Sequence, residues 1–290
     1  MALEADILGM LKRLIKGLVN RYHRLKLFYK YKDILDKNLE LKNKFAGKRC
    51  FILGNGPSIK NQNLLKLADE ETFVVNTFWH HPQYGKIKPK NYVGLDPGPP
   101  NLKSFFFREE LAQKEKELIP HTARFFFNLS GFYEYFRELN VYSNSNVYYL
   151  HLDGFLKDNL VFNVDIDKTI PSVKNVIIGS IMVAVYMGFE TIYLLGCEHS
   201  FLAYNRQFEE EHFFSGTAYT TSENEEERKR YAMTIKSYEG VIDQAKILFR
   251  NYRLLKTKLA KTHPKVKIYN ATPNSFLDVF PYVKYEDIQL

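Results

Sequence analysis

A short turn after an apolar run carries the residues best suited to hold an anion, Gly54-Asn55-Gly56-Pro57-Ser58. Glycines let a backbone approach a phosphate closely, and a helix that follows such a turn presents unpaired N–H groups to an anion. The spacing matches neither the G-x-x-x-x-G-K-S/T pattern nor the G-x-G-x-x-G pattern. The turn therefore indicates a nucleotide phosphate site of another kind, or a tight turn with a structural role alone.

Three further polar clusters follow apolar stretches that are typical of strands, namely Asn76–His81, Gly196–Ser200 and Thr272–Ser275. In an open parallel sheet, ligands bind in the crevice beyond the carboxyl ends of the strands. The amides of Asn55 and Asn76 can bond a ribose or a phosphate, or they can form turns and helix caps. We expect the clusters to meet around one ligand.

Two histidines are candidates for a general base. Transfer of a group to a hydroxyl needs a base near pH 7, and histidine has a suitable unperturbed pKa. His199 follows the apolar run 191–196, and His212 lies in the polar, aromatic loop 201–222. Both could overhang the crevice. A surface position or a hydrogen-bonded structural role is the alternative for each of them.

The acidic triplet at Asp165 and Asp167 has the D-x-D spacing with which many sugar-nucleotide enzymes hold a divalent cation. No obvious buried strand ends there, so a solvated loop is favoured and we expect no metal site. The chain has two cysteines, Cys50 and Cys197, both beside apolar residues and without a C-x-x-C pair. This pattern predicts buried free thiols in a reducing cytoplasm.

The elements that must position these residues alternate between strands and helices. We expect strands at 49–53, 72–75, 91–95, 191–196 and 266–270, and helices at 61–68, 176–189 and 223–260. Residues 101–160 are rich in aromatic side chains and predict strands mixed with a helix and long connections. The pattern indicates an α/β fold with a mostly parallel sheet over residues 46–290.

The first 45 residues form a different kind of segment. Apolar residues recur there at helical spacing beside many lysines and arginines, which predicts a basic amphipathic helix over 1–45. The helix could lie on an anionic membrane surface, or pack against the domain or a partner subunit. The chain has 41 Lys+Arg against 33 Asp+Glu, a net charge of +8, which favours an anionic partner. No nucleic-acid-binding motif occurs, so we expect no nucleic acid.

The sequence also shows neither a membrane-spanning segment nor a signal peptide for export. No run approaches the roughly 20 apolar residues that a spanning helix needs, and no basic start with an apolar core and cleavage site opens the chain. We therefore expect a cytoplasmic protein, peripheral on the inner face of the cytoplasmic membrane if the basic helix binds lipid.

Four segments together resemble a known group of proteins: Phe51–Ile59, Val75–Phe78, Gly179–Gly196 and Thr272–Phe280. Their order and spacing over roughly residues 46–285 resemble the bacterial family-42 sialyltransferases. They also resemble the wider sialyltransferase-like group, DUF115, which includes MptE-like pterin diphosphokinases and Maf-type flagellin-modifying proteins. Each segment is weak by itself, whereas the four in order are fairly specific for this superfamily and for no single activity within it.

The resemblance implies a single Rossmann-like domain that takes a CMP-linked, sialic-acid-like or Kdo-like sugar and needs neither metal nor cofactor. The acceptor would be a glycan or glycolipid of the cell surface, such as lipopolysaccharide or capsule. By position, His212 lies in the loop that carries the family's base. The nucleotide-binding positions would be Gly54, Asn55, Gly56, Pro57, Ser58, Asn76, Ser180, Gly196, Pro273, Asn274 and Ser275.

The chain also departs from the sialyltransferase pattern. Those enzymes place a tyrosine pair after the strand, whereas this chain has Glu198-His199-Ser200 and only Tyr204 nearby. Sialic acid itself, Kdo and another nucleotide donor therefore stay open. Two rival functions stay open as well: an MptE-like ATP-dependent diphosphokinase, in which Mg²⁺ would give the D-x-D pair a purpose, and a non-catalytic nucleotide-binding scaffold.

Overall fold

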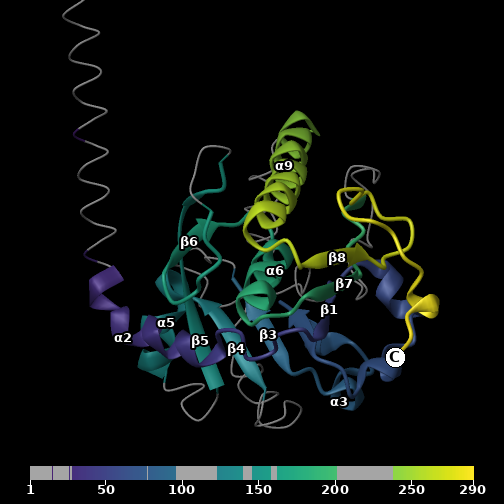
Figure 1. The fold of residues 1–290 in the computed structure, drawn as a ribbon, viewed down its shortest axis with the longest axis horizontal. Coiled ribbons are helices and arrows are strands. Elements are labelled where there is room, and N and C mark those ends of the chain that lie inside the picture. Colours follow the sequence, from purple (N-terminus) through teal and green to yellow (C-terminus); the bar gives the residue numbers. More distant parts are fainter. Residues whose placement is uncertain are drawn as a thin grey trace, which may run out of the picture.

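The computed structural model describes residues 15, 26, 28–76, 78–95, 123–139, 146–157, 162–200 and 238–290. These residues build one eight-stranded sheet with the order β6-β5-β4-β3-β2-β1-β7-β8, and every strand pairing in it is parallel. Helices lie on both sides of the sheet, with α6 and the long α9 packed on one of them (Figure 1). The α/β class and the parallel sheet predicted above are confirmed.

The strands agree closely with the predicted positions where the sequence had a clear apolar run. The aromatic stretch whose pattern was ambiguous supplies β4 and β5, and its residues 101–122 lie outside the described ranges. The strands are β1 Arg49–Leu53, β2 Thr72–Val75, β3 Asn91–Gly94, β4 Arg124–Asn128, β5 Asn146–Phe155, β6 Thr169–Ser172, β7 Thr191–Leu195 and β8 Lys267–Asn270.

α3, α5 and α9 lie in connections between neighbouring parallel strands, whereas α6 lies in the long connection from β6 to β7. The predicted helix at 176–189 is present as α6, and the predicted helix at 223–260 is described from residue 238 onward as α9. The α-helices are α2 Lys32–Asp36, α3 Tyr84–Ile87, α5 Leu129–Leu139, α6 Val176–Tyr186 and α9 Tyr238–Thr262. The 3-10 turns are η1 Lys37–Leu41, η2 Pro57–Asn61, η3 Leu64–Leu67, η4 Phe78–His80 and η6 Tyr285–Asp287.

The α-helix predicted at 61–68 was wrong. The segment forms the two 3-10 turns η2 and η3, separated at Gln62, which has extended backbone angles of φ −95° and ψ 135°. The Gln62 side chain Nε2 donates a hydrogen bond to the carbonyl oxygen of Ala271 at 3.1 Å, which ties this position to the end of β8. A tertiary contact therefore interrupts a stretch that had helical periodicity.

The strand order creates a switch point between β1 and β7. From β1 the chain continues to β2 and on toward β6, whereas from β7 it continues to β8 on the opposite side. The two strands are paired in register over their whole length, from Arg49 opposite Thr191 to Leu53 opposite Leu195. The loops that leave their carboxyl ends thus diverge, and in doubly wound sheets this divergence opens the ligand crevice.

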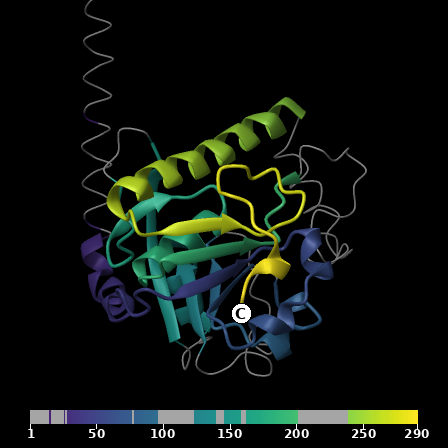
Figure 2. The ribbon, with the colours of Figure 1, turned by 45° about the vertical axis from the view of Figure 1, so that its right-hand side comes forward.

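Alternate residues of the strands bury against different layers, as the period of two requires. One core holds Ile52 and Leu194 with η1, α6 and α9, and the other holds Phe51 and Leu195 with the remaining 3-10 turns, α3 and α5. Because both faces are covered, the central strands are apolar almost throughout. Figure 2 shows α9 lying across the sheet above β7 and β8.

Part of the expected N-terminal segment belongs to the domain itself. Leu35 and Leu41 are completely buried, and Phe45 stacks on Phe189 with ring centroids 4.8 Å apart. The Asn38 side chain donates hydrogen bonds to two main-chain carbonyls of the domain, at 2.8 Å and 2.6 Å. The body of the domain therefore begins before residue 46, the boundary expected from the sequence. Among the described helices, none combines the length and apolar character needed to cross a membrane.

Candidate functional site

Two glycines meet back to back at the switch point. The N–H of Gly54 donates to the carbonyl of Leu195 at 2.7 Å, and the N–H of Gly56 donates to the carbonyl of Gly196 at 2.9 Å. A Cβ on Gly54 would lie 2.3 Å from the oxygen of Gly196, and a Cβ on Gly196 would lie 2.7 Å from the oxygen of Gly54. Gly196 also has φ +63°, which favours glycine. The loops after β1 and β7 are thus held together by their backbones.

The carboxylate of Glu198 lies against the 54–58 turn. The N–H of Ser58 donates to its Oε1 at 2.5 Å, and a Cβ on Gly56 would lie 1.5 Å from its Oε2. The sequence placed Glu198 in the Gly196–Ser200 cluster expected at the crevice and noted it as a departure from the family pattern, but it assigned this carboxylate no role in the site. The turn predicted to hold a phosphate therefore contacts an anionic side chain of the chain itself.

Several oxygens at this site are buried without hydrogen-bond partners. Within the described ranges, no partner is found for Glu198 Oε2, Ser58 Oγ or Asn76 Oδ1. Asn76 follows β2 with φ +47°, and its carbonyl accepts a hydrogen bond from the hydroxyl of Tyr92. Buried polar atoms normally have partners, so a cluster of exceptions marks a place where a bound molecule could supply them.

The predicted asparagines stand close together. The side chain Nδ2 of Asn55 donates to the carbonyl of Val75 at 3.3 Å, which joins the end of β1 to the end of β2 beside Asn76. This contact agrees with the expectation that the polar clusters meet at neighbouring strand ends.

The loop after β8 is fastened to the loop after β7. The hydroxyl of Ser275 donates to the carbonyl of Cys197 at 2.7 Å, and the N–H of Phe276 donates to the carbonyl of Glu198 at 2.8 Å. Just before these two residues, Asn274 is exposed with φ +53°, and Pro273 is half-buried. The structure thus brings the 273–275 corner to the backbone that carries Glu198.

Ser180 does not reach the surface of this site. It is fully buried within α6, and its hydroxyl donates to the carbonyl of Val176 at 2.9 Å. The residue therefore presents no exposed atom to a ligand, and its small size serves the packing of α6 against the sheet.

His199 has a structural environment. Its Nε2 is joined by a 2.9 Å hydrogen bond to the hydroxyl of Tyr252 on α9, and its ring stands edge-on to Phe249. Although the residue keeps some surface, burial of the ring lowers the pKa of His199 to about 4. A base works best when its pKa lies near the working pH, so His199 is poorly suited to that role. His212 lies outside the described residues.

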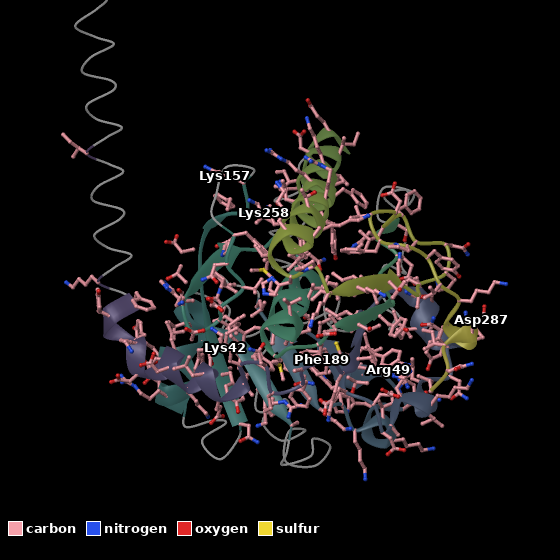
Figure 3. The ribbon with its side chains drawn as sticks, viewed as in Figure 1. Lys42, Arg49, Lys157, Phe189, Lys258 and Asp287 are labelled. Atoms are coloured by element: carbon pink, nitrogen blue, oxygen red, sulfur yellow. The ribbon has the colours of Figure 1, made fainter. Side chains whose placement is uncertain are left out.

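The D-x-D pair lies far from the switch point in the order of the strands. Asp165 forms ion pairs with Lys42 at 3.2 Å and Lys168 at 3.5 Å, at the amino end of the edge strand β6. Figure 3 places Lys42 on the β5 side of the molecule and Asp287 on the β8 side. Among the described residues, no group of three or more His, Cys, Asp or Glu side chains is arranged to hold a metal ion.

Both cysteines are free and buried, as the sequence predicted. Burial raises the pKa of the Cys50 thiol and of the Cys197 thiol above their ordinary value, which keeps both protonated and unreactive.

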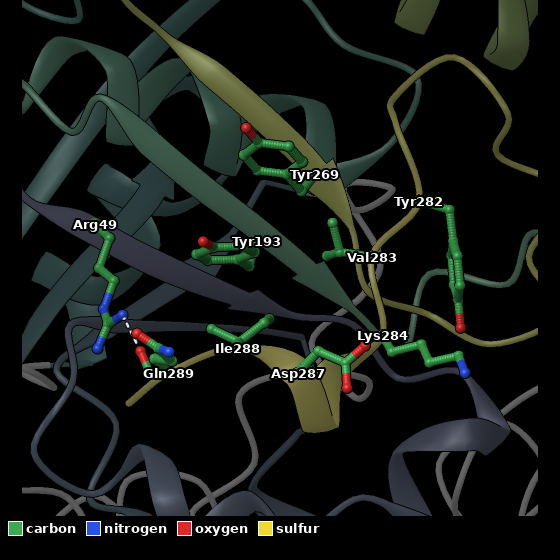
Figure 4. Close-up of a pocket in the computed structure, with 9 residues that line it drawn as sticks. All are labelled: Arg49, Tyr193, Tyr269, Tyr282, Val283, Lys284, Asp287, Ile288 and Gln289. Carbon is green, nitrogen blue, oxygen red and sulfur yellow. Dashed lines mark hydrogen bonds between the residues drawn. The ribbon is translucent and has the colours of Figure 1, made fainter.

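A separate pocket lies on one face of β1, β7 and β8 and does not include the switch-point residues (Figure 4). Its volume is about 720 Å³, and Tyr193 and Tyr269 stack in it with ring centroids 5.5 Å apart. The guanidinium of Arg49 is already engaged by Glu70 at 2.6 Å and by the carbonyl of Gln289 at 2.5 Å. We place the candidate site at the strand ends, because the glycine contact of the β1 and β7 loops lies there beside buried oxygens of Ser58, Asn76 and Glu198 for which no partner is found in the described part of the chain. The residues that line this pocket are Arg49, Tyr193, Tyr269, Tyr282, Val283, Lys284, Asp287, Ile288 and Gln289.

Comparisons with known proteins give one informative match. No family model and no curated protein sequence matches the chain. Among solved structures, the chain is similar to the Maf glycosyltransferase from Magnetospirillum magneticum AMB-1, with a TM-score of 0.50 and 13% sequence identity. The match covers 91% of this chain and 39% of that chain, so this chain spans about two fifths of the longer protein. The similarity shows a common Rossmann-like α/β fold.

Proposed function

We propose that the chain is a glycosyltransferase that binds a nucleotide-activated sugar at the carboxyl ends of β1, β2, β7 and β8. The observation that carries this proposal is the paired Gly54 and Gly196 backbones at the topological switch point, beside buried oxygens without partners. The shared fold of a protein named as a glycosyltransferase supports it. The switch point is also the place where doubly wound folds bind nucleotides.

The proposed donor is a CMP-linked acidic sugar, sialic-acid-like or Kdo-like, and the proposed acceptor is a cell-surface glycan or glycolipid. The sequence resemblance described above supports this choice, and the net charge of +8 suits an anionic donor.

In the proposed reaction the bond between the anomeric carbon and the phosphate oxygen breaks, and the acceptor oxygen bonds to that carbon. The acceptor proton passes to a base, and CMP leaves with the electron pair of the broken bond. The low pKa of His199 leaves His212 as the proposed base. We propose no metal ion for this reaction, because the site is proposed to act by holding the donor and the acceptor in place and by taking the acceptor's proton.

The basic segment at the N-terminus is proposed to bring the enzyme to the inner face of the cytoplasmic membrane. Ile15, which belongs to its apolar stripe, is 52% exposed. An exposed apolar side chain within a lysine-rich and arginine-rich segment suits an anionic lipid surface.

The test is CMP release by the full-length protein from CMP-sialic acid and CMP-Kdo, with a lipooligosaccharide acceptor and EDTA present. We expect turnover with one of the two donors, and a loss of about 100-fold or more in His212→Ala, which is the usual effect of losing a general base. The matched control is His263→Ala, at the end of α9, which should keep full activity.

Two outcomes would contradict the proposal. Product formed only from ATP and abolished by EDTA would indicate a diphosphokinase, and nucleotide binding without any turnover would indicate a scaffold. A His212→Ala protein with full activity would remove the role of that histidine.

A further inference from the structure

Three backbone N–H groups of the 54–58 turn already donate hydrogen bonds inside the chain. The N–H groups of Gly54 and Gly56 donate to carbonyls at the end of β7, and the N–H of Ser58 donates to Glu198. Pro57 has no N–H group. A phosphate needs donors or cations around its oxygens, whereas this turn meets a carboxylate. Three N–H groups of the turn are therefore not free for a phosphate, and the nearby carboxylate of Glu198 would repel one.

The atoms that remain at the site are oxygens. Glu198 is only 7% exposed, and its Oε2 has no hydrogen-bond partner in the described part of the chain. None of the ion pairs among the described residues includes Glu198. A buried carboxylate oxygen without a donor or a cation is costly, so a ligand that supplies a donor would be bound favourably.

Two more oxygens stand at the neighbouring strand ends. Ser58 Oγ follows β1 and Asn76 Oδ1 follows β2, and both are buried without partners among the described residues. Since adjacent strands lie about 4.8 Å apart, the ends of β2, β1 and β7 span roughly 10 Å, which is the scale of a nucleoside. The segments that follow β1, β2 and β7 thus each carry a buried oxygen for which no partner is found among the described residues.

We propose that Glu198 accepts hydrogen bonds from the vicinal hydroxyls of the ribose of the nucleotide sugar. The turn would then contact the ribose of the nucleotide and not its phosphate. This inference rests on the proposed function, because it assumes a nucleotide ligand. Acidic side chains near the strand ends of doubly wound sheets recognise ribose hydroxyls by the same chemistry. Gly56 is required because any side chain there would displace the Glu198 carboxylate.

The test is isothermal titration of the full-length protein with CMP and with 2′-deoxy-CMP, with EDTA present throughout. Hydrogen bonds to a charged acceptor are stronger than neutral ones, so the wild type is expected to bind CMP about tenfold more tightly or better. Glu198→Gln keeps an oxygen for the Ser58 N–H but loses the charge. It is expected to lose about tenfold in CMP affinity and less in 2′-deoxy-CMP affinity, because the deoxynucleotide keeps only the 3′-hydroxyl as a donor to residue 198.

The matched control is Glu190→Gln, the same substitution just before β7, which should keep the wild-type affinities for both nucleotides. The inference is overturned if Glu198→Gln keeps the preference for CMP, or weakens both nucleotides equally. A wild type that binds both nucleotides equally overturns the inference and leaves nucleotide binding intact. A wild type that binds neither overturns the proposed function as well.

Discussion

At the scale of single residues, the position of Glu198 changes which part of a nucleotide the Gly-rich turn would meet. Its carboxylate bonds to the N–H of Ser58 and leaves no room for a side chain at Gly56. The turn residues were recognisable from their types, because two glycines after an apolar strand are a local signal. The contact with Glu198 joins positions 140 residues apart in the chain, and no local pattern could reveal it.

His199 allows a test of the site's electrostatics through protein stability. Burial lowers its pKa from 6.5 to about 4, so between these two pH values the unfolded chain binds a proton that the folded protein does not bind. Stability is therefore full above pH 6.5 and is lost as the pH falls through this window. Between pH 7.5 and pH 5 this one group should lower the free energy of unfolding by about 2 kcal/mol.

The measurement is urea unfolding at pH 7.5 and pH 5, for the wild type and for His199→Gln. Because burial also lowers the pKa values of His81, His151 and His263, only the difference between the two proteins reports on His199. The glutamine can still bond to Tyr252 and does not titrate. Equal losses in both proteins would show that His199 is not buried as described.

At the scale of elements, the approach of the β1 and β7 loops depends on glycine for two separable reasons. Gly196 has φ +63° and a close neighbour, the oxygen of Gly54, whereas Gly47 has φ +76° and nothing within 4 Å of an added Cβ. Alanine at Gly47 should cost about 1 kcal/mol from backbone strain alone. Alanine at Gly196 should cost about 1–3 kcal/mol more, because it also overpacks the loop contact.

Chemical denaturation of Gly47→Ala measures the cost of backbone strain, and the additional loss in Gly196→Ala measures the cost of overpacking the loop contact. The account expects the larger loss at Gly196, together with weaker nucleotide binding in that variant alone. Equal losses of stability in the two variants would show that the loops do not approach each other as described.

The helices and strands that could be predicted were those whose apolar residues follow one clear pattern, either a short continuous run or a helical spacing. The apolar runs of β1, β2 and β7 and the small-residue helix α6 match their predicted positions closely. The aromatic runs at 125–127 and 147–149 were ambiguous, because the pattern alone does not separate a buried strand from other structures. The helix predicted at 61–68 was wrong because the Gln62 side chain bonds to the end of β8, and the spacing of apolar residues gives no sign of such a long-range contact.

At the scale of the whole molecule, the N-terminal segment divides into a part that builds the domain and a part proposed to bind lipid. Deletion of residues 1–27 should leave the free energy of unfolding nearly unchanged and abolish cosedimentation with phosphatidylglycerol vesicles. Deletion of residues 1–41 should also destabilise the domain by several kcal/mol, because it removes Leu35 and Leu41, both completely buried. The control is cosedimentation with phosphatidylcholine vesicles, which should be weak for every form.

Unchanged binding of the 1–27 deletion to anionic vesicles would place membrane contact elsewhere. Unchanged stability of the 1–41 deletion would contradict the packing of α2 and η1 onto β5.

A nucleotide is proposed to bind where the loops after β1 and β7 diverge. The most direct test is hydrogen–deuterium exchange of the full-length protein with and without CMP, read out by peptide mass spectrometry. We expect slower exchange in peptides covering 54–60, 196–199 and 271–277, and no change in the peptide covering 282–290 beside the aromatic pocket. Protection confined to 282–290, or no protection anywhere in these four peptides, would contradict the proposal.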